Sequence, residues 1–336
     1  MAHQVTLQPS GHCFSVADNA TILEAALDAG INLPYGCKNG ACGACKGKVV
    51  AGQVDLGIAQ DSALPADERI AGMALFCCAT PLSDLTLEVR EVNAARDIPV
   101  KTLPCRVQQL ERIADDVMVI RLKLPTNERM QFLAGQYIEF LLADGKRRAF
   151  SLASPPHADD LLELHVRYVP GGNFTDHVFH KMKVKDIMRI EGPLGSFFLR
   201  EDSTKPIILL AGGTGFAPLK GLVEHALHIG IQRPMQLYWG ARDRAGLYMN
   251  ALAEQWAAEN GIAYTPVLSA PAASDGWTGR TGLVHEAVLA DHPDLSAYQV
   301  YACGAPVMCE AALKDFTAHG LPKEEFFADV FSYAPK

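Results

Sequence analysis

The sequence lacks the features that would place a protein in a membrane or on a nucleic acid. No stretch reaches the length and apolarity of a transmembrane helix. The first residues do not show the basic segment followed by an apolar one that marks a signal peptide. Positive charge is not in excess, because 30 Lys and Arg stand against 38 Asp and Glu, for a formal net charge of −8. We therefore expect a cytoplasmic protein with no membrane span and no nucleic-acid partner.

The cysteine content also argues against a disulfide scaffold. The nine cysteines are an odd number in a long chain without a visible secretory signal, a setting in which thiols usually stay reduced. At 336 residues the chain is too long for one ordinary core, so two or three domains are expected. The hydrophobic share of 49% and the mixed charges are typical of a globular protein. Some of the thiols are then candidates for metal ligands.

Three cysteines, Cys37, Cys42 and Cys45, have C-x4-C-x2-C spacing, and Cys77 follows further along. This is the spacing of a plant-type [2Fe-2S] cluster. Zinc is the main alternative, but structural zinc sites commonly pair two C-x2-C knuckles, and only one is present here. Glycines allow the tight turns of a cluster loop and let N–H groups point at the sulfurs. The glycines interleaved with the cysteines are Gly36, Gly40, Gly43 and Gly47.

The fourth ligand is a choice between two adjacent cysteines. The region resembles plant-type ferredoxin domains, which place the last ligand in a Leu-x-Cys pattern, and Leu75-Phe76-Cys77 matches that pattern. The resemblance therefore implies Cys77 and not Cys78. The cysteines left over are expected to be small core residues: Cys13, Cys78, Cys105 and Cys309. Lysines near the loop could meet an acidic partner, although solvated surface lysines are the commoner explanation: Lys38, Lys46 and Lys48.

Around this loop the pattern predicts a small mixed sheet with one helix. A hairpin is expected around Ser10-Gly11. Thr21-Ile-Leu-Glu24 fits a capping box, and Gly30 is a good helix stop. The expected strands are Val5–Leu7, Phe14–Val16, Lys48–Val54 and Leu85–Val92.

The middle of the chain has frequent turns and little helical periodicity, which predicts a β-barrel or β-sandwich. It follows a polar stretch, Asn93–Lys101, that contains a proline and is interpreted as a linker. The expected strands are Cys105–Leu110, Val117–Leu124, Gln136–Leu142 and Leu162–Tyr168.

Two short motifs in this part can bind a phosphorylated cofactor. In Arg148-Ala149-Phe150-Ser151, the arginine can pair with phosphate, the phenylalanine can pack on a flat ring system, and the serine can hydrogen-bond it. In Gly171-Gly172-Asn173-Phe174-Thr175, glycines precede a short expected helix, Asp176–Met182, and offer N–H groups to a diphosphate. A surface arginine beside a buried phenylalanine is the simpler explanation of the first motif, and each motif is weak alone.

The C-terminal part alternates strands with helices, which predicts a doubly wound parallel sheet. The expected strands are Ile207–Leu210, Gln236–Trp239, Ala263–Leu268 and Gln299–Ala302. The expected helices are Ala217–His228, Ala251–Ala258, Val284–Leu289 and Val307–Ala318.

The first strand of this part leads into a glycine-rich turn that opens a helix. From Gly213 the turn has the pattern G-x-G-x-x-P. Such turns offer backbone N–H groups to a phosphate, so this one is expected to bind a nicotinamide cofactor. The residues expected to take part are Gly212, Gly213, Thr214, Gly215 and Pro218, with Arg242 after the second strand.

Taken in order, the flavin and nicotinamide motifs resemble those of the ferredoxin–NADP reductase superfamily. The resemblance implies that Arg148 holds flavin phosphate, that Phe150 packs on the isoalloxazine, and that Ser151 reaches the flavin ring near N5. It also implies that residues 172–175 cradle the diphosphate.

Two further matches belong to the same resemblance. Cys303-Gly304-Ala305-Pro306 is similar to a Cys-Gly-x-Pro motif whose cysteine lies beside the nicotinamide. Phe326–Phe331 is similar to a terminal acidic–x–aromatic motif beside the flavin. Cys303 and Phe331 could be plain core residues, but with the other motifs in register we expect them, together with Ser151, to act in catalysis.

The whole chain resembles three-domain reductases that begin with a ferredoxin domain. We expect a β-grasp ferredoxin domain in 1–93, a linker in 94–101, an FAD-binding antiparallel β-barrel in 102–204 and a doubly wound NAD(P)-binding domain in 205–336. The resemblance implies a [2Fe-2S] cluster and FAD, and NADH is favoured over NADPH because Asp243 accompanies Arg242 and Arg244.

The function expected from this resemblance is electron transfer from NADH through FAD and the cluster to a partner protein. The reductases of bacterial multicomponent oxygenases are the first match, so a terminal oxygenase is the expected acceptor. CDP-6-deoxy-3,4-glucoseen reductase, which serves a pyridoxamine-dependent sugar dehydrase, is the alternative. A redox-sensing protein or a free flavin reductase is the remaining interpretation. A monomer is favoured.

Overall fold

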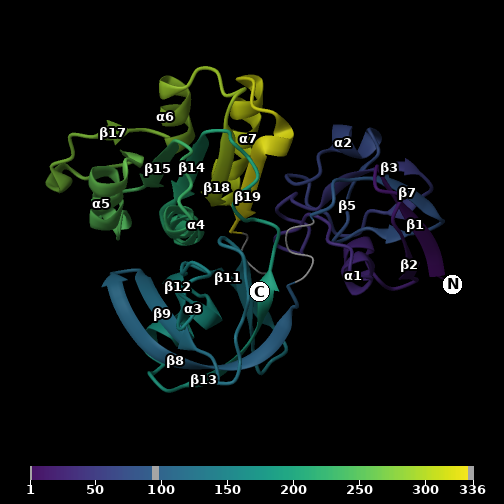
Figure 1. Cartoon of the computed structure of the whole chain (residues 1–336), viewed down its shortest axis with the longest axis horizontal. Coiled ribbons are helices and arrows are strands. Elements are labelled where there is room, and N and C mark those ends of the chain that lie inside the picture. Colours follow the sequence, from purple (N-terminus) through teal and green to yellow (C-terminus); the bar gives the residue numbers. More distant parts are fainter. Residues whose placement is uncertain (1, 93–97, 332–336) are drawn as a thin grey trace. The chain divides into compact units, whose positions relative to one another are not determined.

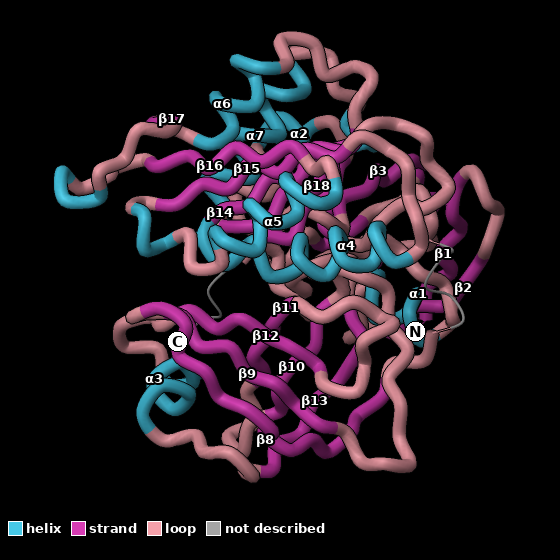
Figure 2. The backbone as a smooth tube through the Cα atoms, turned by 60° about the vertical axis from the view of Figure 1, so that its left-hand side comes forward, coloured by secondary structure: helices cyan, strands magenta, loops and turns pink. Residues whose placement is uncertain are grey.

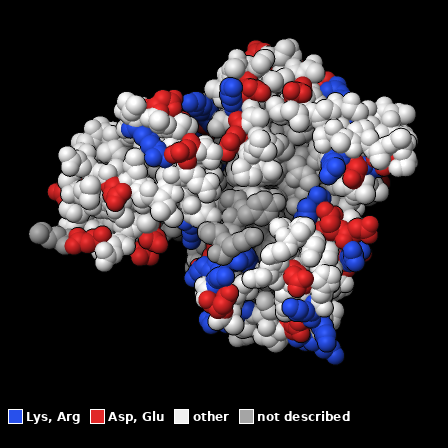
Figure 3. Space-filling view, turned by 180° about the vertical axis from the view of Figure 1, so that it is seen from behind, with Lys and Arg blue, Asp and Glu red and all other residues white. Residues whose placement is uncertain are grey.

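The computed structural model describes residues 2–92 and 98–331, and the chain divides into two compact units (Figure 1). The first unit consists of Met1–Pro99 with Leu194–Phe197, and the second of Val100–Pro193 with Phe198–Lys336. In the part of the chain that the structure describes, no helix is both long and apolar enough to cross a bilayer. Acidic and basic side chains are interspersed on the face drawn in Figure 3.

The first unit is built on a mixed five-stranded sheet with strand order β2-β1-β7-β3-β5. Only β1 and β7 run parallel, and the other neighbours are antiparallel. Val5 and Leu7 alternate with polar residues and are fully buried, as period-2 patterning requires of a sheet with one buried face. The elements are β1 (Ala2–Gln8), β2 (Cys13–Ala17), α1 (Ile22–Asp28), β3 (Lys46–Ala51), β4 (Val54–Asp55), α2 (Ala66–Ile70), β5 (Met73–Leu75), β6 (Thr80–Pro81) and β7 (Leu85–Glu88).

The structure confirms the expected hairpin and capping box of this unit. It corrects the ends of two strands and the number of helices. The Thr21 hydroxyl accepts from the Glu24 N–H at 3.2 Å, and the Glu24 carboxylate accepts from the Thr21 N–H at 3.1 Å. The strand expected to run to residue 54 ends earlier, because Gly52 has a φ of +95°. The strand expected over 85–92 ends at Glu88. The short helix α2 was not predicted, so the expectation of one helix was wrong.

The first part of the second unit is an antiparallel sheet with strand order β11-β10-β13-β8-β9-β12. A bridge between Leu152 and Leu164 joins the two end strands, so the sheet closes into a barrel. Ile120, Ile138 and Phe140 are fully buried inside it. The elements are β8 (Lys101–Ala114), β9 (Val117–Lys123), β10 (Tyr137–Leu141), β11 (Arg147–Ser151), β12 (Leu162–Arg167), α3 (Asn173–His180) and β13 (Ile187–Leu194).

The barrel confirms the predicted class and shifts two boundaries. Strand β8 begins at Lys101, so the last residue of the expected linker belongs to a strand, while residues 93–97 of that linker lie outside the described residues. Helix α3 begins at Asn173, earlier than the expected Asp176, because Gly172 takes the N-cap position with extended dihedral angles. The exact domain limits stay a prediction.

The second part of this unit is a parallel sheet with strand order β17-β16-β15-β14-β18-β19. The chain leaves β14 to one side and later returns to its other side, which makes the β14–β18 gap the switch point where such sheets bind ligands. The strands are β14 (Ile207–Gly212), β15 (Met235–Ala241), β16 (Ala263–Leu268), β17 (Arg280–Thr281), β18 (Gln299–Gly304) and β19 (Phe326–Val330).

Helices lie on both sides of this sheet, with α4 and α5 on one face and α6 and α7 on the other (Figure 2). This confirms the predicted doubly wound architecture. Strand β16 has the predicted bounds, and the other predicted strands and helices of this part extend beyond their predicted bounds. The helices are η2 (Gly213–Gly215), α4 (Phe216–His228), η3 (Arg244–Gly246), α5 (Asn250–Asn260), η4 (Ala273–Asp275), α6 (Val284–Asp291), α7 (Pro306–Ala318) and η5 (Lys323–Glu325).

Removing the capping box should weaken the first unit. We expect Thr21→Ala to lower its free energy of unfolding by about 1 kcal/mol, because the first turn of α1 loses a hydrogen-bond acceptor. Urea unfolding followed by the visible circular dichroism of the cluster would measure this. Thr21→Ser keeps the hydroxyl and should behave as the natural protein, and equal midpoints for both variants would contradict the expectation.

Candidate cofactor sites

The four predicted cluster ligands come together in the first unit as two pairs. The Cys37 N–H points at the Cys42 sulfur at 3.4 Å, and the Cys77 N–H points at the Cys45 sulfur at 3.5 Å. The thiol of Cys42 lowers the pKa of Cys37 to about 6, and the thiols of Cys45 and Cys78 lower the pKa of Cys77. The same thiol contacts, together with burial, raise the pKa of Cys42 and of Cys45, so each pair holds one thiol with a lowered pKa and one with a raised pKa.

This pairwise arrangement fits a cluster of two irons, each held by two thiolates. It fits a single zinc ion less well, because no three metal-ligating side chains among residues 2–92 and 98–331 converge on one point. The assignment of the four cysteines as ligands stays a prediction that this geometry supports.

One glycine of the loop is required by close packing. Gly40 has a φ of +75°, and a Cβ atom there would lie 2.7 Å from the Cys78 sulfur and 3.2 Å from the Ala59 Cα. Any side chain at this position would push the cluster loop away from the segment it packs on. The glycine pattern of the sequence therefore has a physical cause at this position.

The structure places Cys77, not Cys78, against Cys45. Cys77 is buried, whereas Cys78 is half-buried with its sulfur 3.6 Å from that of Cys77. The expectation that Cys78 and Cys13 are core residues was wrong, since Cys13 is exposed on an edge strand. Cys105 and Cys309 are buried, as predicted. Of the lysines near the loop, Lys46 is paired with Glu68 and is less available to a partner than expected.

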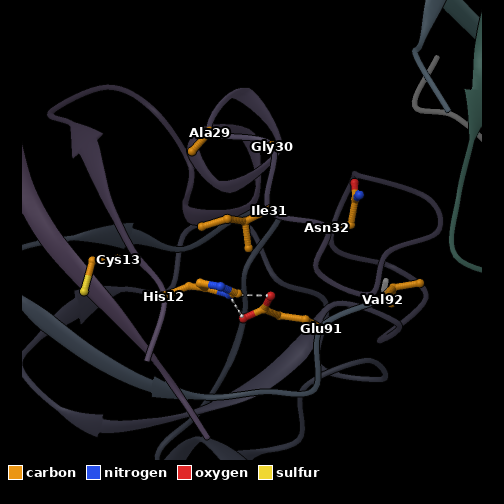
Figure 4. A pocket seen from close by; sticks show the side chains of 8 residues that line it. All are labelled: His12, Cys13, Ala29, Gly30, Ile31, Asn32, Glu91 and Val92. Carbon is orange, nitrogen blue, oxygen red and sulfur yellow. Dashed lines mark hydrogen bonds and ion pairs between the residues drawn. The ribbon is translucent and has the colours of Figure 1, made fainter. Parts of the chain in front are cut away.

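A cavity of about 230 Å³ also lies in the first unit (Figure 4). His12 and Glu91 form an ion pair at 2.9 Å on its wall, and Cys13 borders it. None of the four predicted cluster ligands lines it, so the cavity is separate from the cluster loop.

The flavin motif occupies β11 at the end of the barrel sheet. Phe150 is half-buried and tilted against Phe174 with ring centroids 5.4 Å apart. The neighbouring arginines differ: Arg147 is paired with Glu139 and Glu191, whereas Arg148 donates to the Arg147 carbonyl at 2.7 Å and has no ion pair within the described residues. Arg148 can therefore turn to a phosphate, as predicted, without breaking a salt bridge.

The predicted diphosphate cradle is the N-terminus of α3. A helix leaves its first N–H groups without intrahelical partners, so residues Asn173, Phe174 and Thr175 can offer theirs to a phosphate. A Cβ at Gly172 would lie 2.8 Å from the Thr175 hydroxyl, so the turn excludes a side chain there. The Thr175 hydroxyl itself bonds Val169, at 3.2 Å, and holds the turn. Gly171, with a φ of +76°, and exposed Ala149 contribute backbone only.

The nicotinamide turn follows β14 as the 3-10 helix η2. A Cβ at Gly215 would lie 1.9 Å from the Cys303 carbonyl oxygen, so only glycine permits this approach of turn and strand. A Cβ at Gly212 would lie 2.6 Å from the Met308 sulfur. The Trp239 indole N–H donates to the Gly213 carbonyl at 3.0 Å and fixes the turn. The structure thus brings the predicted residues 212–215 to the switch point, with Pro218 buried in the first turn of α4.

Arg167, at the end of β12, lies against this turn and was missed by sequence reasoning. Its guanidinium carbon lies 3.5 Å from the Cβ position of Gly213. Its Nε and Nη2 atoms are buried and make no hydrogen bond, and Nη1 lies 3.4 Å from Asp116. Buried guanidinium atoms without partners are expected to find them in an anionic ligand. The sequence signal that could have revealed it is an arginine at the end of a strand that leads, through Tyr168-Val169-Pro170, into the Gly171-Gly172 turn.

The predicted catalytic residues Ser151 and Cys303 meet around a third group, Asp329. The Ser151 hydroxyl donates to the Asp329 carboxylate at 2.5 Å. Cys303 is fully buried, and its partner in the parallel register of β18 and β19 is Asp329. Burial raises the pKa of Asp329 to about 6, against the opposing effect of the serine hydrogen bond. Asp329 was missed as a site residue although it is the acidic member of the terminal motif.

The remaining predicted residues lie at the same carboxyl edge of the sheet. The Phe331 N–H donates to the Gly304 carbonyl at 2.9 Å, and Pro306 opens α7. Arg242 follows β15 and is exposed, while the Asp243 carboxylate caps Gly246 at 3.1 Å. Asp243 is thus held at the end of the second strand, where an acidic side chain suits a ribose hydroxyl better than a 2′-phosphate.

Comparisons with known proteins agree with this division of the chain. Residues 5–82 match the family described as 2Fe-2S iron-sulfur cluster binding domain, residues 104–199 the oxidoreductase FAD-binding domain, and residues 209–314 the oxidoreductase NAD-binding domain. Together these matches cover most of the chain in the order that the sequence predicted.

Relatives align with nearly the whole length of this chain. The chain is 43% identical over 332 residues to the CDP-6-deoxy-L-threo-D-glycero-4-hexulose-3-dehydrase reductase of Yersinia pestis, covering 98% of this chain and 99% of the relative. It is 38% identical to the reductase component of phenol 2-monooxygenase from Pseudomonas sp. (strain CF600), with 98% and 95% covered. The crystal structure of Amycolatopsis cytochrome P450 reductase GcoB is similar with a TM-score of 0.78 at 35% identity, covering 98% of each chain.

The chain belongs to the family of iron–sulfur flavoprotein reductases with 2Fe-2S, FAD-binding and NAD-binding domains. It is an oxidoreductase that takes electrons from a nicotinamide cofactor and passes them through FAD and a [2Fe-2S] cluster. When bound, FAD accepts a hydride and the cluster accepts single electrons.

Losing one paired cysteine should remove the cluster but not the flavin reaction. We expect Cys42→Ser to lose the visible absorbance of the cluster while NADH still reduces ferricyanide, because the flavin and nicotinamide residues lie in the other unit. Cys78→Ala is the control, since Cys78 lies outside both pairs, and it should keep the absorbance. Intact bands in Cys42→Ser, or their loss in Cys78→Ala, would refute the ligand assignment.

Replacing Asp329 should change how stability depends on pH. A carboxyl whose folded pKa is raised from 3.8 to about 6 contributes stability below pH 3.8 that is lost as the pH rises through 6. Asp329→Asn keeps an acceptor for Ser151 but does not ionise. We therefore expect the free energy of unfolding of the variant, relative to that of the natural protein, to rise by up to about 3 kcal/mol as the pH goes from 4 to 7. Thermal unfolding across this range would show it, and a difference that does not vary with pH would be the contrary outcome.

Proposed function

We propose that this reductase delivers single electrons to a separate dehydrase that acts on a CDP-linked hexulose. The observation that carries the proposal is the full-length match, at 43% identity, to a reductase named for such a dehydrase. The same name belongs to a 42% identical relative from Yersinia pseudotuberculosis. Both relatives are matched over 99% of their length, so no domain of theirs is missing from the comparison.

The residues proposed for each step follow from the site geometry. Cys37, Cys42, Cys45 and Cys77 would hold the cluster from which electrons leave. Arg148 and the α3 N-terminus would hold the FAD phosphates. Ser151, Cys303, Asp329 and Phe331 would place the flavin and nicotinamide rings against each other.

The nicotinamide cofactor would be NADH. Arg167 and the turn of residues 213–215 would hold its phosphates, and capped Asp243 would disfavour a 2′-phosphate. No general acid or base is needed for a hydride transfer, so the site residues orient the rings and exclude water. The preference for a monomer and for the cytoplasm stays a prediction.

A terminal oxygenase is the second candidate acceptor, and it was the first expectation from the sequence. The 38% identical phenol 2-monooxygenase reductase component and the 35% identical terephthalate 1,2-dioxygenase reductase component of Comamonas sp. favour it. These identities are lower than those of the dehydrase reductases, although the matches are equally complete.

Direct electron delivery to purified acceptors would decide between the two. The NADH-reduced protein is mixed rapidly with the Yersinia dehydrase or with a terephthalate dioxygenase, and reoxidation of the cluster is followed by its absorbance. We expect reoxidation by the dehydrase at least tenfold faster than by the oxygenase at equal concentration. Faster reoxidation by the oxygenase would overturn the dehydrase assignment. In Cys42→Ser, which should lack the cluster, reoxidation of the flavin followed by its own absorbance gives the background rate.

A further inference from the structure

Strand β12 carries a polar face that the flavin site does not use. Leu162, Leu164 and Val166 point into the barrel core. Because side chains alternate along a strand, Glu163, His165 and Arg167 share the opposite face. Such a face is usually solvated, yet Glu163 and His165 are only 6% and 5% exposed.

Glu163 is the centre of a buried ionic cluster. Its Oε1 lies 3.1 Å from His165 Nε2 and 3.2 Å from the Lys220 ammonium, and its Oε2 accepts from Arg121 at 2.7 Å. Burial alone would raise the pKa of Glu163, but the His165 hydrogen bond and the charges of Lys220 and Arg121 outweigh it and lower that pKa. The carboxylate therefore stays ionised, and Lys220 of α4 is held against the barrel strand.

His165 links this cluster to the nicotinamide domain. Burial lowers the pKa of His165 against the opposing effect of the Glu163 carboxylate, which favours the neutral ring. With Nε2–H donating to the Glu163 carboxylate, Nδ1 is left to accept from the Tyr248 hydroxyl, 2.9 Å away. The two ring nitrogens therefore join a charged group of the barrel to a tyrosine in the turn that precedes α5.

Tyr248 packs on two aromatic residues, one of which contacts the nicotinamide turn of residues 213–215. Its ring meets Trp239 edge-on at 5.3 Å and Phe216 edge-on at 6.0 Å, and these two rings are stacked at 3.9 Å. Trp239 in turn donates to the Gly213 carbonyl. A continuous set of packed side chains thus runs from Glu163 to the turn that precedes α4.

A second contact fixes the same helix to the flavin strand. A Cβ at Gly221 of α4 would lie 3.2 Å from the carbonyl oxygens of Leu152 and Ser154, so the helix backbone packs directly on the residues after Ser151. The Lys220 ammonium lies 3.4 Å from the Ala153 carbonyl in the same segment. The position of α4 therefore sets the position of Ser151 relative to the nicotinamide turn.

We propose that His165 is a positioning residue for hydride transfer, which acts by holding Tyr248 and the nicotinamide turn in register with the flavin-binding strand of the barrel. It touches neither cofactor in this role. Its effect passes through the Tyr248 hydroxyl on one side and the Glu163–Lys220 pair on the other. The proposal concerns the reaction between NADH and FAD and does not depend on which protein accepts the electrons.

The variant Tyr248→Phe tests this with the least disturbance. It removes the hydroxyl that donates to His165 and keeps the ring that packs on Trp239 and Phe216. Stopped-flow reduction of the FAD-loaded protein by NADH should slow by roughly fivefold or more, since a buried acceptor loses its donor and a small displacement of the rings costs rate. The long-wavelength charge-transfer absorbance between nicotinamide and flavin, which reports ring stacking, should weaken as well.

Tyr264→Phe is the matched control. Tyr264 also donates a tyrosine hydrogen bond, to Asn250 at 2.8 Å, but between β16 and α5, away from the barrel. The variant should leave both the reduction rate and the charge-transfer absorbance unchanged. Tyr264→Phe also loses a part-buried hydrogen bond of a tyrosine hydroxyl. It therefore shows how much of the effect of Tyr248→Phe comes from a general loss of stability.

Coupling between the two partners gives a second, independent measurement. His165→Gln should slow flavin reduction as Tyr248→Phe does, and the double variant should be no slower than the slower single variant, since both break the same contact. The proposal would be overturned if Tyr248→Phe had the same rate of flavin reduction and the same charge-transfer absorbance as the natural protein. Equal losses in Tyr248→Phe and Tyr264→Phe, or single-variant effects that simply add, would overturn it too.

Discussion

The second unit depends on a short hydrogen bond between a barrel strand and the edge of a parallel sheet. Ser151 ends β11, and Asp329 lies on β19, the last strand of the chain. Asp329 is half-buried, and burial raises the pKa of its carboxyl group while the Ser151 hydroxyl donates to it. Sheet register places Cys303 beside this pair, so the residues predicted to handle the cofactor rings are fixed by backbone pairing and not by flexible loops.

The polar face of β12 is a second place where the barrel is held against the parallel-sheet part of the unit. Two acidic and two basic side chains gather there in a nearly neutral cluster: Glu163, Glu224, Lys220 and Arg121. Buried ion pairs of this kind give little net stability, because desolvation offsets their attraction. They do penalise any other arrangement, since a shifted helix would leave a charge buried without its partner. The cluster therefore selects one docking position for α4 more than it strengthens the fold.

The sequence predicted the architecture and most site residues for physical reasons that act locally. Cysteine spacing, glycine turns and the alternation of strands with helices are imposed by neighbouring residues. The structure confirms the alternation, while the roles of the cysteines and glycines stay predictions that its geometry supports. Cys13 was expected in the core because a cysteine usually is buried, but edge strand β2 leaves it exposed. Helix α2 carries no buried residue, so no hydrophobic period announced it.

The residues that were missed owe their importance to contacts across long sequence separations. Arg167 matters because Gly213 lies against it, and Asp329 because Ser151 does. The network of Glu163, His165 and Tyr248 likewise joins strand β12 to the turn before α5, more than 80 positions further along the chain. In the sequence alone, Glu163 and His165 belong to an ordinary strand and Tyr248 to an ordinary loop. No neighbouring residue indicates that the outer face of β12 is covered by another part of the chain.

The pairing of the cluster cysteines has a consequence for how the cluster is assembled. Cys45 directly precedes β3 and Cys77 follows β5, and the register of these strands, Lys46 opposite Leu75, already aligns the two thiols. Cys37 and Cys42 lie on the loop alone and have no strand to align them. One half of the candidate metal site is therefore aligned by the pairing of two strands, and the other half only by the loop that carries it. A cluster assembled here would thus be held by one pair of sulfurs that the sheet aligns and one pair that the loop carries.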